Sequence, residues 1–168
     1  MLGLFALAVF AGLLIYAACS DVARLIIPNW VSIALAAAFP LAALAAGMPL
    51  AVIGVHLLFG VAVLAVGFFL FAANIIGGGD AKLLAAAAVW TGFPAFAPFA
   101  FWTAIAGGAM ALVLLAARHF IKQAEKRPVF VNRLLKPQGG VPYGVAIMAG
   151  GLMAMPALPF TLGSLTLP

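Results

Sequence analysis

The sequence contains very little charge. Charged residues make up 7% of the 168 residues, whereas hydrophobic residues make up 68%. A soluble domain carries about 25% charged and about 45–50% apolar residues. A soluble fold of this size would still expose about a third of its unfolded surface, so this composition excludes one. The solvent around most of the chain must be the hydrocarbon of a lipid bilayer.

Cysteine and histidine are also scarce. Cys19 is the single cysteine, and His56 and His119 are the two histidines. One cysteine excludes an intramolecular disulfide, and no cluster of Cys and His provides a zinc-ligand set. We therefore expect neither a metal nor a cofactor. His56 is expected to be buried, neutral and hydrogen-bonded between helices rather than to ligate a metal.

Long apolar runs, separated by Gly, Pro or polar residues, occupy most of the chain. A run of about 20 apolar residues crosses a bilayer as a helix. No Lys or Arg precedes the first run, so it lacks the basic region of a secretion signal and is expected to remain as a span. The pattern predicts an all-α, polytopic membrane protein with about six transmembrane helices in a single domain, residues 1–168. The expected spans are residues 2–19, 30–46, 50–73, 83–93, 98–117 and 141–160.

The few charged residues lie in three of the connections between these spans. The eight Lys and Arg and the three Asp and Glu residues fall in loops at about residues 20–29, 74–82 and 118–140. These loops follow odd-numbered spans and therefore share one side of the membrane. An excess of Lys and Arg marks the cytoplasmic face. We expect a multi-pass protein of the bacterial inner membrane with both termini outside.

The net charge of +5 has the same explanation, so we expect no nucleic-acid partner. The basic residues of the third loop, residues 118–136, can set the topology with the help of anionic lipid. This role is favoured over a second one, as an arm that binds a partner protein.

The acidic residues are Asp21, Asp80 and Glu125. Glu125 lies among basic residues, where solvated ion pairs are expected. Asp21 and Asp80 lie at the membrane boundary, in the turns of two helical hairpins that point the same way. Neither acid is needed for insertion, so each requires another explanation. One explanation is structural: Asp80 caps the helix that follows it, and Asp21 accepts hydrogen bonds from backbone amides in its own turn.

The other explanation is a catalytic pair. Two facing carboxylates can share one proton, because like charges in close contact cannot both ionise cheaply. One carboxylate then draws a proton from water while the other protonates the scissile amide. The three glycines of residues 77–79 remove side chains next to Asp80. They would let an extended peptide approach and make unusual backbone dihedrals available.

Three segments together resemble the type IV prepilin peptidases, which are GxGD-type aspartyl proteases of the bacterial inner membrane. They are Asp21 with Arg24 and the Ile-Pro-Asn of residues 27–29, the GGGDAKL of residues 77–83, and the Val-Pro-Tyr-Gly of residues 141–144. The resemblance implies that Asp21 and Asp80 are catalytic. It also implies cleavage of the leader of a prepilin-like precursor at the cytoplasmic face, just after a glycine.

Other residues near the two acids are candidates for supporting or substrate-binding roles. They are Arg24, Asn29, Gly77, Gly78, Gly79 and Lys82. Arg24 and Lys82 also fit a plainer role as interfacial cations that reach for lipid headgroups, and Asn29 is expected to begin the second helix.

The resemblance also indicates which form of the family is present. The long bifunctional members carry paired Cys-x-x-Cys motifs, which this sequence lacks. The chain resembles the short form found with Tad/Flp pilus systems, so N-methylation of the new pilin terminus is not expected. The expected partners are a prepilin-like precursor, membrane lipid and the pilus assembly machinery.

Two non-enzymatic hypotheses remain open from the sequence. In the first, the protein is a proton-coupled carrier, although carriers usually place their acids near the bilayer midplane. In the second, it is a scaffold of a pilus or secretion machine in which both aspartates only cap helices. An activity assay separates the scaffold from the peptidase.

Overall fold

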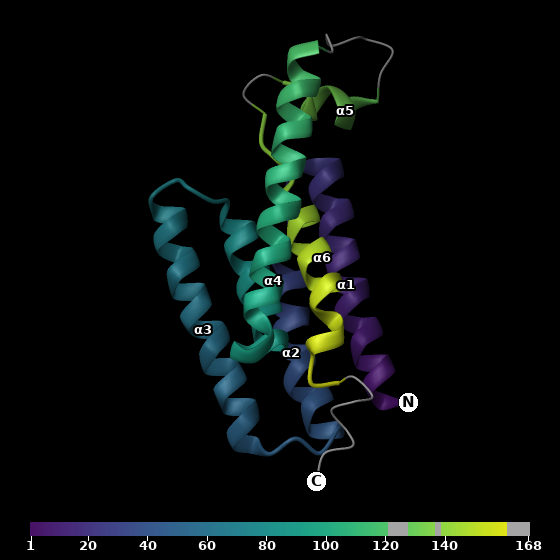
Figure 1. Ribbon diagram of the computed structural model, residues 1–168, viewed down its shortest axis with the longest axis vertical. Coiled ribbons are helices and arrows are strands. Elements are labelled where there is room, and N and C mark those ends of the chain that lie inside the picture. The colour runs from purple at the N-terminus through teal and green to yellow at the C-terminus, as the bar shows by residue number, and fades with distance from the viewer. Residues whose placement is uncertain (121–127, 137–138, 161–168) are drawn as a thin grey trace.

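The protein is a bundle of helices (Figure 1). The structure, a computed structural model, describes residues 1–120, 128–136 and 139–160, and these ranges contain no strand. The elements are α1 (Leu2–Arg24), α2 (Asn29–Ala45), α3 (Leu50–Ala72), α4 (Gly78–Phe120), α5 (Val129–Leu134), α6 (Tyr143–Ala154) and the 3₁₀ helix η1 (Met155–Ala157). The all-α fold class predicted from the sequence is confirmed.

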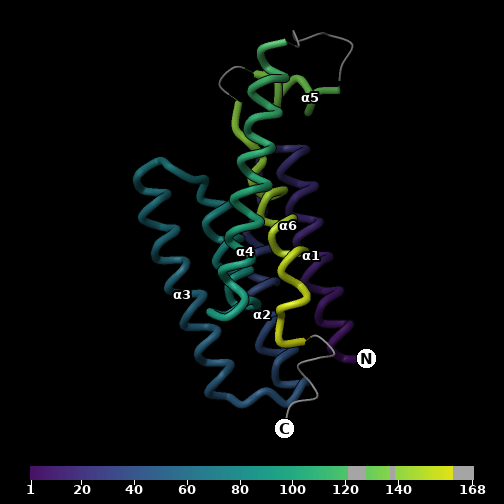
Figure 2. Tube along the Cα trace, in the orientation of Figure 1, coloured from purple at the N-terminus to yellow at the C-terminus, as the bar shows by residue number. Residues whose placement is uncertain are grey.

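Helix α4 reverses its direction at Gly92. The backbone there has φ 55° and ψ −171°, a conformation open essentially to glycine alone. Figure 2 shows the chain turning back on itself, so that residues 78–91 form a first arm and residues 93–120 a second arm. In one straight helix, Asp80 and Ala111 would lie about 45 Å apart at about 1.5 Å per residue. Because of the reversal, both line the same pocket.

The helices have the length and composition of a polytopic membrane protein. Helices α1, α3 and α4 are long and apolar enough to cross a membrane, and α2 and α6 are shorter apolar helices. Since α4 contributes two arms, the described residues provide about six apolar segments, as predicted. The first arm is only about 20 Å long, against about 30 Å of hydrocarbon. The turn between the arms accordingly stops short of the far ends of α2 and α3 (Figure 1).

The boundaries of several predicted segments were wrong. The first span continues to Arg24 instead of ending at residue 19, so the predicted loop at 20–29 begins inside α1. The fourth span was expected over residues 83–93, with a helix that could begin at Gly79 or Asp80; the helix begins at Gly78, so Asp80 lies inside its first turn. The sixth ends at Ala154 instead of residue 160, because Pro156 in the following 3₁₀ helix has no amide hydrogen to continue an α-helix. The predicted loop at residues 118–140 begins inside α4 and contains the short helix α5.

Trp90, in the first arm of α4, lies at the centre of the core. Its side chain is fully buried, and its indole N–H donates to the carbonyl oxygen of Leu35 in α2 at 2.8 Å. Its ring centroid lies 5.1 Å from Phe10 of α1, 5.8 Å from Phe39 of α2 and 5.4 Å from Phe160. A single side chain thereby joins the first arm to α1, α2 and the segment after η1.

His56 joins α3 to this core. It is buried, its ring stacks on Phe39 with centroids 4.8 Å apart, and Nδ1 lies 2.8 Å from the carbonyl oxygen of Val89. Since a carbonyl can only accept, Nδ1 carries the proton and donates it. The predicted buried histidine, hydrogen-bonded between helices, is confirmed.

Helix α6 packs closely against its neighbours at positions without side chains. A Cβ added at Gly150 would overlap Thr103 of the second arm, and one added at Gly107 would lie 2.5 Å from the Tyr143 hydroxyl. Gly107 is therefore a close-packing position, whereas an added Cβ at the neighbouring Gly108 meets nothing within 4 Å.

The turn at Gly92 gives a first testable prediction. Gly92→Ala is expected to lower the free energy of unfolding by about 1–3 kcal/mol. Any side chain there must adopt the strained conformation and would lie 2.5 Å from the His56 ring. Unfolding in mixed detergent micelles measures the change. Gly108→Ala is the matched control, and equal stabilities of the two variants would contradict the assignment of the turn to glycine.

Candidate active site

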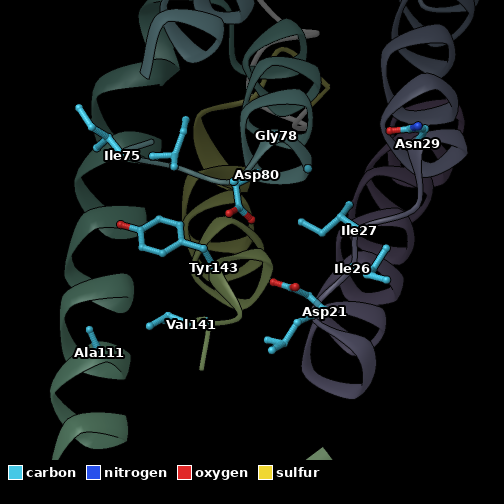
Figure 3. Close-up of a pocket in the computed structure, with 15 residues that line it drawn as sticks. Asp21, Ile26, Ile27, Asn29, Ile75, Gly78, Asp80, Ala111, Val141 and Tyr143 are labelled. Atoms are coloured by element: carbon cyan, nitrogen blue, oxygen red, sulfur yellow. The ribbon is translucent and has the colours of Figure 1, made fainter. Parts of the chain in front are cut away.

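A pocket of about 830 Å³ lies where the turn after α1, the turn before α4 and the start of α6 meet (Figure 3). Both aspartates singled out in the sequence line it, although they lie on different helices. The apolar part of the lining comes from residues such as Leu25, Ile26, Ile27, Ile75, Ile76, Ala111 and Val141. The pocket thus combines two carboxyl groups with a largely aliphatic wall.

Asp21 lies in the last turn of α1 and is 5% exposed. An acid at the carboxyl end of its own helix meets unfavourable backbone carbonyls. Its partner is instead the start of α6, where the Gly144 N–H donates to Oδ2 at 2.7 Å. The expectation that Asp21 bonds amides in its own turn is therefore wrong, because the amino end of α6 supplies both the donor and the favourable end of a helix dipole.

Gly144 permits this contact because it has no side chain. A Cβ there would lie 3.0 Å from Oδ2 and 3.1 Å from Cβ of Asp21, and 3.2 Å from Ile27. In the sequence, residues 141–144 are recognisable only as part of the family resemblance, and no role could be assigned to them. A glycine at the start of an apolar helix was the only signal of a close contact at Gly144, and nothing in the sequence near it indicates Asp21 as the partner.

Asp80 lies in the first turn of α4, and the backbone N–H of Gly77 donates to its carboxylate. This is the contact of a capping residue, so Asp80 caps its helix and also lines the pocket. A Cβ at Gly77 would lie 2.7 Å from Oδ2 of Asp80, and one at Gly79 would lie 3.2 Å from Ile27.

Gly77 and Gly79 therefore lie in close contact with Asp80 and Ile27, which would have to shift to accept a side chain at either position. The unusual dihedrals expected for residues 77–79 are not observed, because the positive-φ glycines among the described residues are Gly47 and Gly92.

The carboxylates of Asp21 and Asp80 point toward one another inside the pocket (Figure 3). They are close enough for the charge of Asp21 to act on Asp80. Each accepts one hydrogen bond from a backbone amide, from Gly144 or Gly77. A carboxylate offers about four acceptor positions, so both retain capacity for a water molecule or a substrate.

The other candidate residues near the pocket differ in their placement. Lys82 donates from Nζ to Oδ1 of Asn29 at 3.0 Å, which joins the first arm to the start of α2. Asn29 begins α2, as predicted, and lies at the pocket edge. Arg24 is exposed in the last turn of α1, where a cation suits the helix dipole. Neither Lys82 nor Arg24 lines the pocket.

Two arginines hold the segment that leads into α6. Arg118 donates to the carbonyl oxygens of Leu134 at 2.9 Å, Gly139 at 2.7 Å and Gly140 at 2.9 Å. Arg133 of α5 donates to the carbonyl oxygen of Ala23 in α1 at 3.1 Å. From the sequence, these cations were expected to set the topology or, less favoured, to bind a partner protein, and this contact with backbone carbonyls was missed. Because Gly140 lines the pocket, Arg118 helps to fix the pocket wall.

Some expectations concern residues outside the described ranges. Glu125 and its expected ion pairs fall in residues 121–127, which lie outside those that the structure describes. Among the described residues, no three His, Cys, Asp or Glu side chains gather in a group that could hold a metal ion.

The contact between Asp21 and Gly144 gives a second prediction. Gly144→Ala is expected to destabilise the protein by about 1–3 kcal/mol, typical of overpacking, because the methyl group must push α6 away from Asp21. The measurement is the apparent melting temperature in detergent. Gly12→Ala is the control, since an added Cβ at Gly12 meets nothing within 4 Å. If Gly144→Ala and Gly12→Ala have the same apparent melting temperature, the tight contact between α6 and Asp21 is contradicted.

The chain matches a protein family. No curated protein and no solved structure matches the chain significantly. The model of the Type IV leader peptidase family matches residues 8–112, more than half of the chain, and the matched region includes Asp21, Asp80 and the turn at Gly92. The family is one of proteases that act on prepilin-like substrates. The chain is a membrane protein that belongs to the Type IV leader peptidase family.

Proposed function

We propose that the protein is an aspartyl endopeptidase that removes the leader peptide of prepilin-like precursors, with Asp21 and Asp80 as its catalytic pair. One observation carries the proposal. Two carboxylates from helices far apart in the sequence point toward one another in one pocket (Figure 3). They are two of only three acidic residues in the chain.

The chemistry follows from one proton shared by the pair. Two adjacent carboxylates cannot both ionise cheaply, so one is protonated while the other is charged. The charged one takes a proton from a water molecule, which attacks the scissile carbonyl carbon. The protonated one gives its proton to the carbonyl oxygen, which leaves a tetrahedral intermediate with two hydroxyl groups. When this intermediate breaks down, one hydroxyl returns its proton to the pair as the carbonyl re-forms, and the leaving amine takes a proton from the pair. The pair ends with the one proton with which it began.

The surroundings of the pair suit this role. The amides of Gly144 and Gly77 fix the two carboxylates without using all their acceptor positions. The aliphatic wall limits competing water around the reacting groups, and residues 77–79 leave the backbone bare on one side of the pocket. An extended peptide could lie against this backbone, with its scissile bond between the acids. Asn29, at the pocket edge, would contact the bound peptide, whereas Lys82 would act through Asn29.

We further propose that the site faces the cytoplasm and that the membrane is the bacterial inner membrane. The described Lys and Arg residues lie on the carboxyl end of α1, both ends of α4, and α5 with the residues directly after it. These segments lie at the end of the bundle opposite the N-terminus (Figure 1). An excess of Lys and Arg marks the cytoplasmic face, so both termini would lie outside.

The proposed precursor is of the Tad/Flp type. The sequence resembles the short form of the family, and its only cysteine is Cys19, so the paired Cys-x-x-Cys motifs of the bifunctional members have no counterpart. We propose peptidase activity without N-methylation, in one membrane domain of residues 1–168. The pilus assembly machinery would receive the processed pilin.

The pair of acids gives a third prediction. Asp21→Asn and Asp80→Asn are each expected to lower precursor processing by about 10²–10⁴-fold, the usual contribution of a general acid or base. An amide oxygen still accepts the hydrogen bond from Gly144 or Gly77 but cannot exchange the proton. Processing is measured in membranes that contain equal amounts of each variant and a Flp-type precursor.

Glu125→Gln is the matched control, because it removes the third carboxylate of the chain. The wild-type rate should also fall at both low and high pH, where the pair carries two protons or none. If either Asp→Asn variant, present at normal abundance, processes the precursor at the wild-type rate, the pair is structural and the scaffold hypothesis is supported.

A further inference from the structure

A second hollow lies directly beside the candidate active site. It is a groove of about 520 Å³ between α2, α3 and the first arm of α4, and it is lined almost entirely by apolar side chains. Its lining residues are Asn29, Ser32, Ile33, Ala36, Leu57, Gly60, Val61, Leu64, Lys82, Ala85, Ala86 and Val89. We call it the α2–α3 groove.

The α2–α3 groove and the active-site pocket share one lining residue. Asn29 lines both cavities, and the hydrogen bond from Lys82 to Asn29 lies at their junction. Along α2 the groove extends from Asn29 to Ala36, which is about 10 Å at about 1.5 Å per residue. It therefore runs from the edge of the active-site pocket toward the middle of the proposed membrane.

One wall of this groove has no partner among the residues that the structure describes. Helix α3 packs against the first arm of α4 and stands apart from α2 (Figure 1). On its groove side, Val61 is 62% and Leu64 42% exposed, and Ile33 of α2 is 67% exposed. Small residues such as Ala85 and Ala86 lie on the groove side of the first arm. Small residues let a further helix approach closely inside a membrane.

Ser32 independently indicates that the groove binds a further segment. This groove residue is 7% exposed, and within residues 1–120, 128–136 and 139–160 its buried hydroxyl has no hydrogen-bond partner. A buried polar group without a partner is costly. Serine side chains often supply hydrogen bonds between membrane helices.

We propose that the α2–α3 groove binds the first turns of the hydrophobic helix of the precursor, directly after the scissile bond. The inference rests on the proposed function, because that function places the scissile bond between Asp21 and Asp80. The residues that follow the bond must then leave the pocket, and the apolar groove begins at Asn29, which also lines the pocket. The small residues along the first arm receive the substrate helix, and the Ser32 hydroxyl bonds to it.

The test fills the groove with a large side chain. Ala36→Trp occupies the groove, whereas Ala37→Trp places the same side chain at the adjacent exposed position outside it. Each full-length variant is reconstituted in liposomes. It is assayed on a full-length precursor and on a synthetic peptide that spans the cleavage site but ends before the hydrophobic helix.

Ala36→Trp is expected to raise the KM for the full-length precursor by about tenfold and to leave cleavage of the short peptide unchanged. Ala37→Trp should leave both unchanged. If Ala36→Trp processes the precursor like wild type, or slows both substrates equally, the proposal is overturned. A wild-type protein that cleaves neither substrate overturns the proposed function itself, and the two failures are thereby distinguishable.

Cross-linking tests occupancy without depending on turnover. In a Cys19→Ser background with Asp21→Asn and Asp80→Asn, a cysteine replaces Ala36 or Ala37, and a second cysteine is placed in the first turns of the precursor helix. A cross-link through Ala36→Cys that Ala37→Cys does not give supports the proposal. Equal cross-linking at both positions, or none at Ala36→Cys, shows that lipid alone fills the groove and overturns it.

Discussion

The hydrogen bond from the Gly144 amide to Asp21 is the constraint on which the candidate site depends. It joins the last turn of α1 to the first turn of α6 at 2.7 Å. The bond requires α6 to lie against α1 without a side chain at residue 144. It also offsets the position of Asp21 at the unfavourable end of its own helix dipole. Arg118 holds the segment before α6 at its other end, through Gly139 and Gly140.

The reversal at Gly92 brings the other half of the site into place. It allows the first arm of α4 to begin at the pocket and the second arm to return beside α6. Trp90, His56 and their partners fill the space around this turn, so the first arm is fixed from α1, α2 and α3. Asp80 thus stands on a short helix that is anchored at its far end, and the pocket needs no contact between α2 and α3. The groove beside the pocket is the space left by that arrangement.

The fold and the two acids were predictable from the sequence because charge is rare in it. Apolar runs predict the helices, and Asp21 and Asp80 are conspicuous as acids at helix ends. The Asp21–Gly144 contact was not predictable, since nothing local to either residue specifies a partner so far along the chain. The sequence predicted a break between two spans near Gly92 but not a tight reversal. Likewise, a loop rich in cations predicts topology and does not reveal that Arg118 binds backbone carbonyls.

The location of the two acids at helix ends has a physical reason under the proposed mechanism. A peptide must be extended to be cleaved, and each unpaired backbone group within hydrocarbon costs several kcal/mol. At the end of the bundle, water and the bare backbone of residues 77–79 can satisfy an extended segment. The rest of a hydrophobic substrate can remain helical in the membrane, with its own hydrogen bonds intact. A site at the bilayer midplane would require the substrate helix to unwind there, whereas a site at Asp21 and Asp80 requires only its end to unwind.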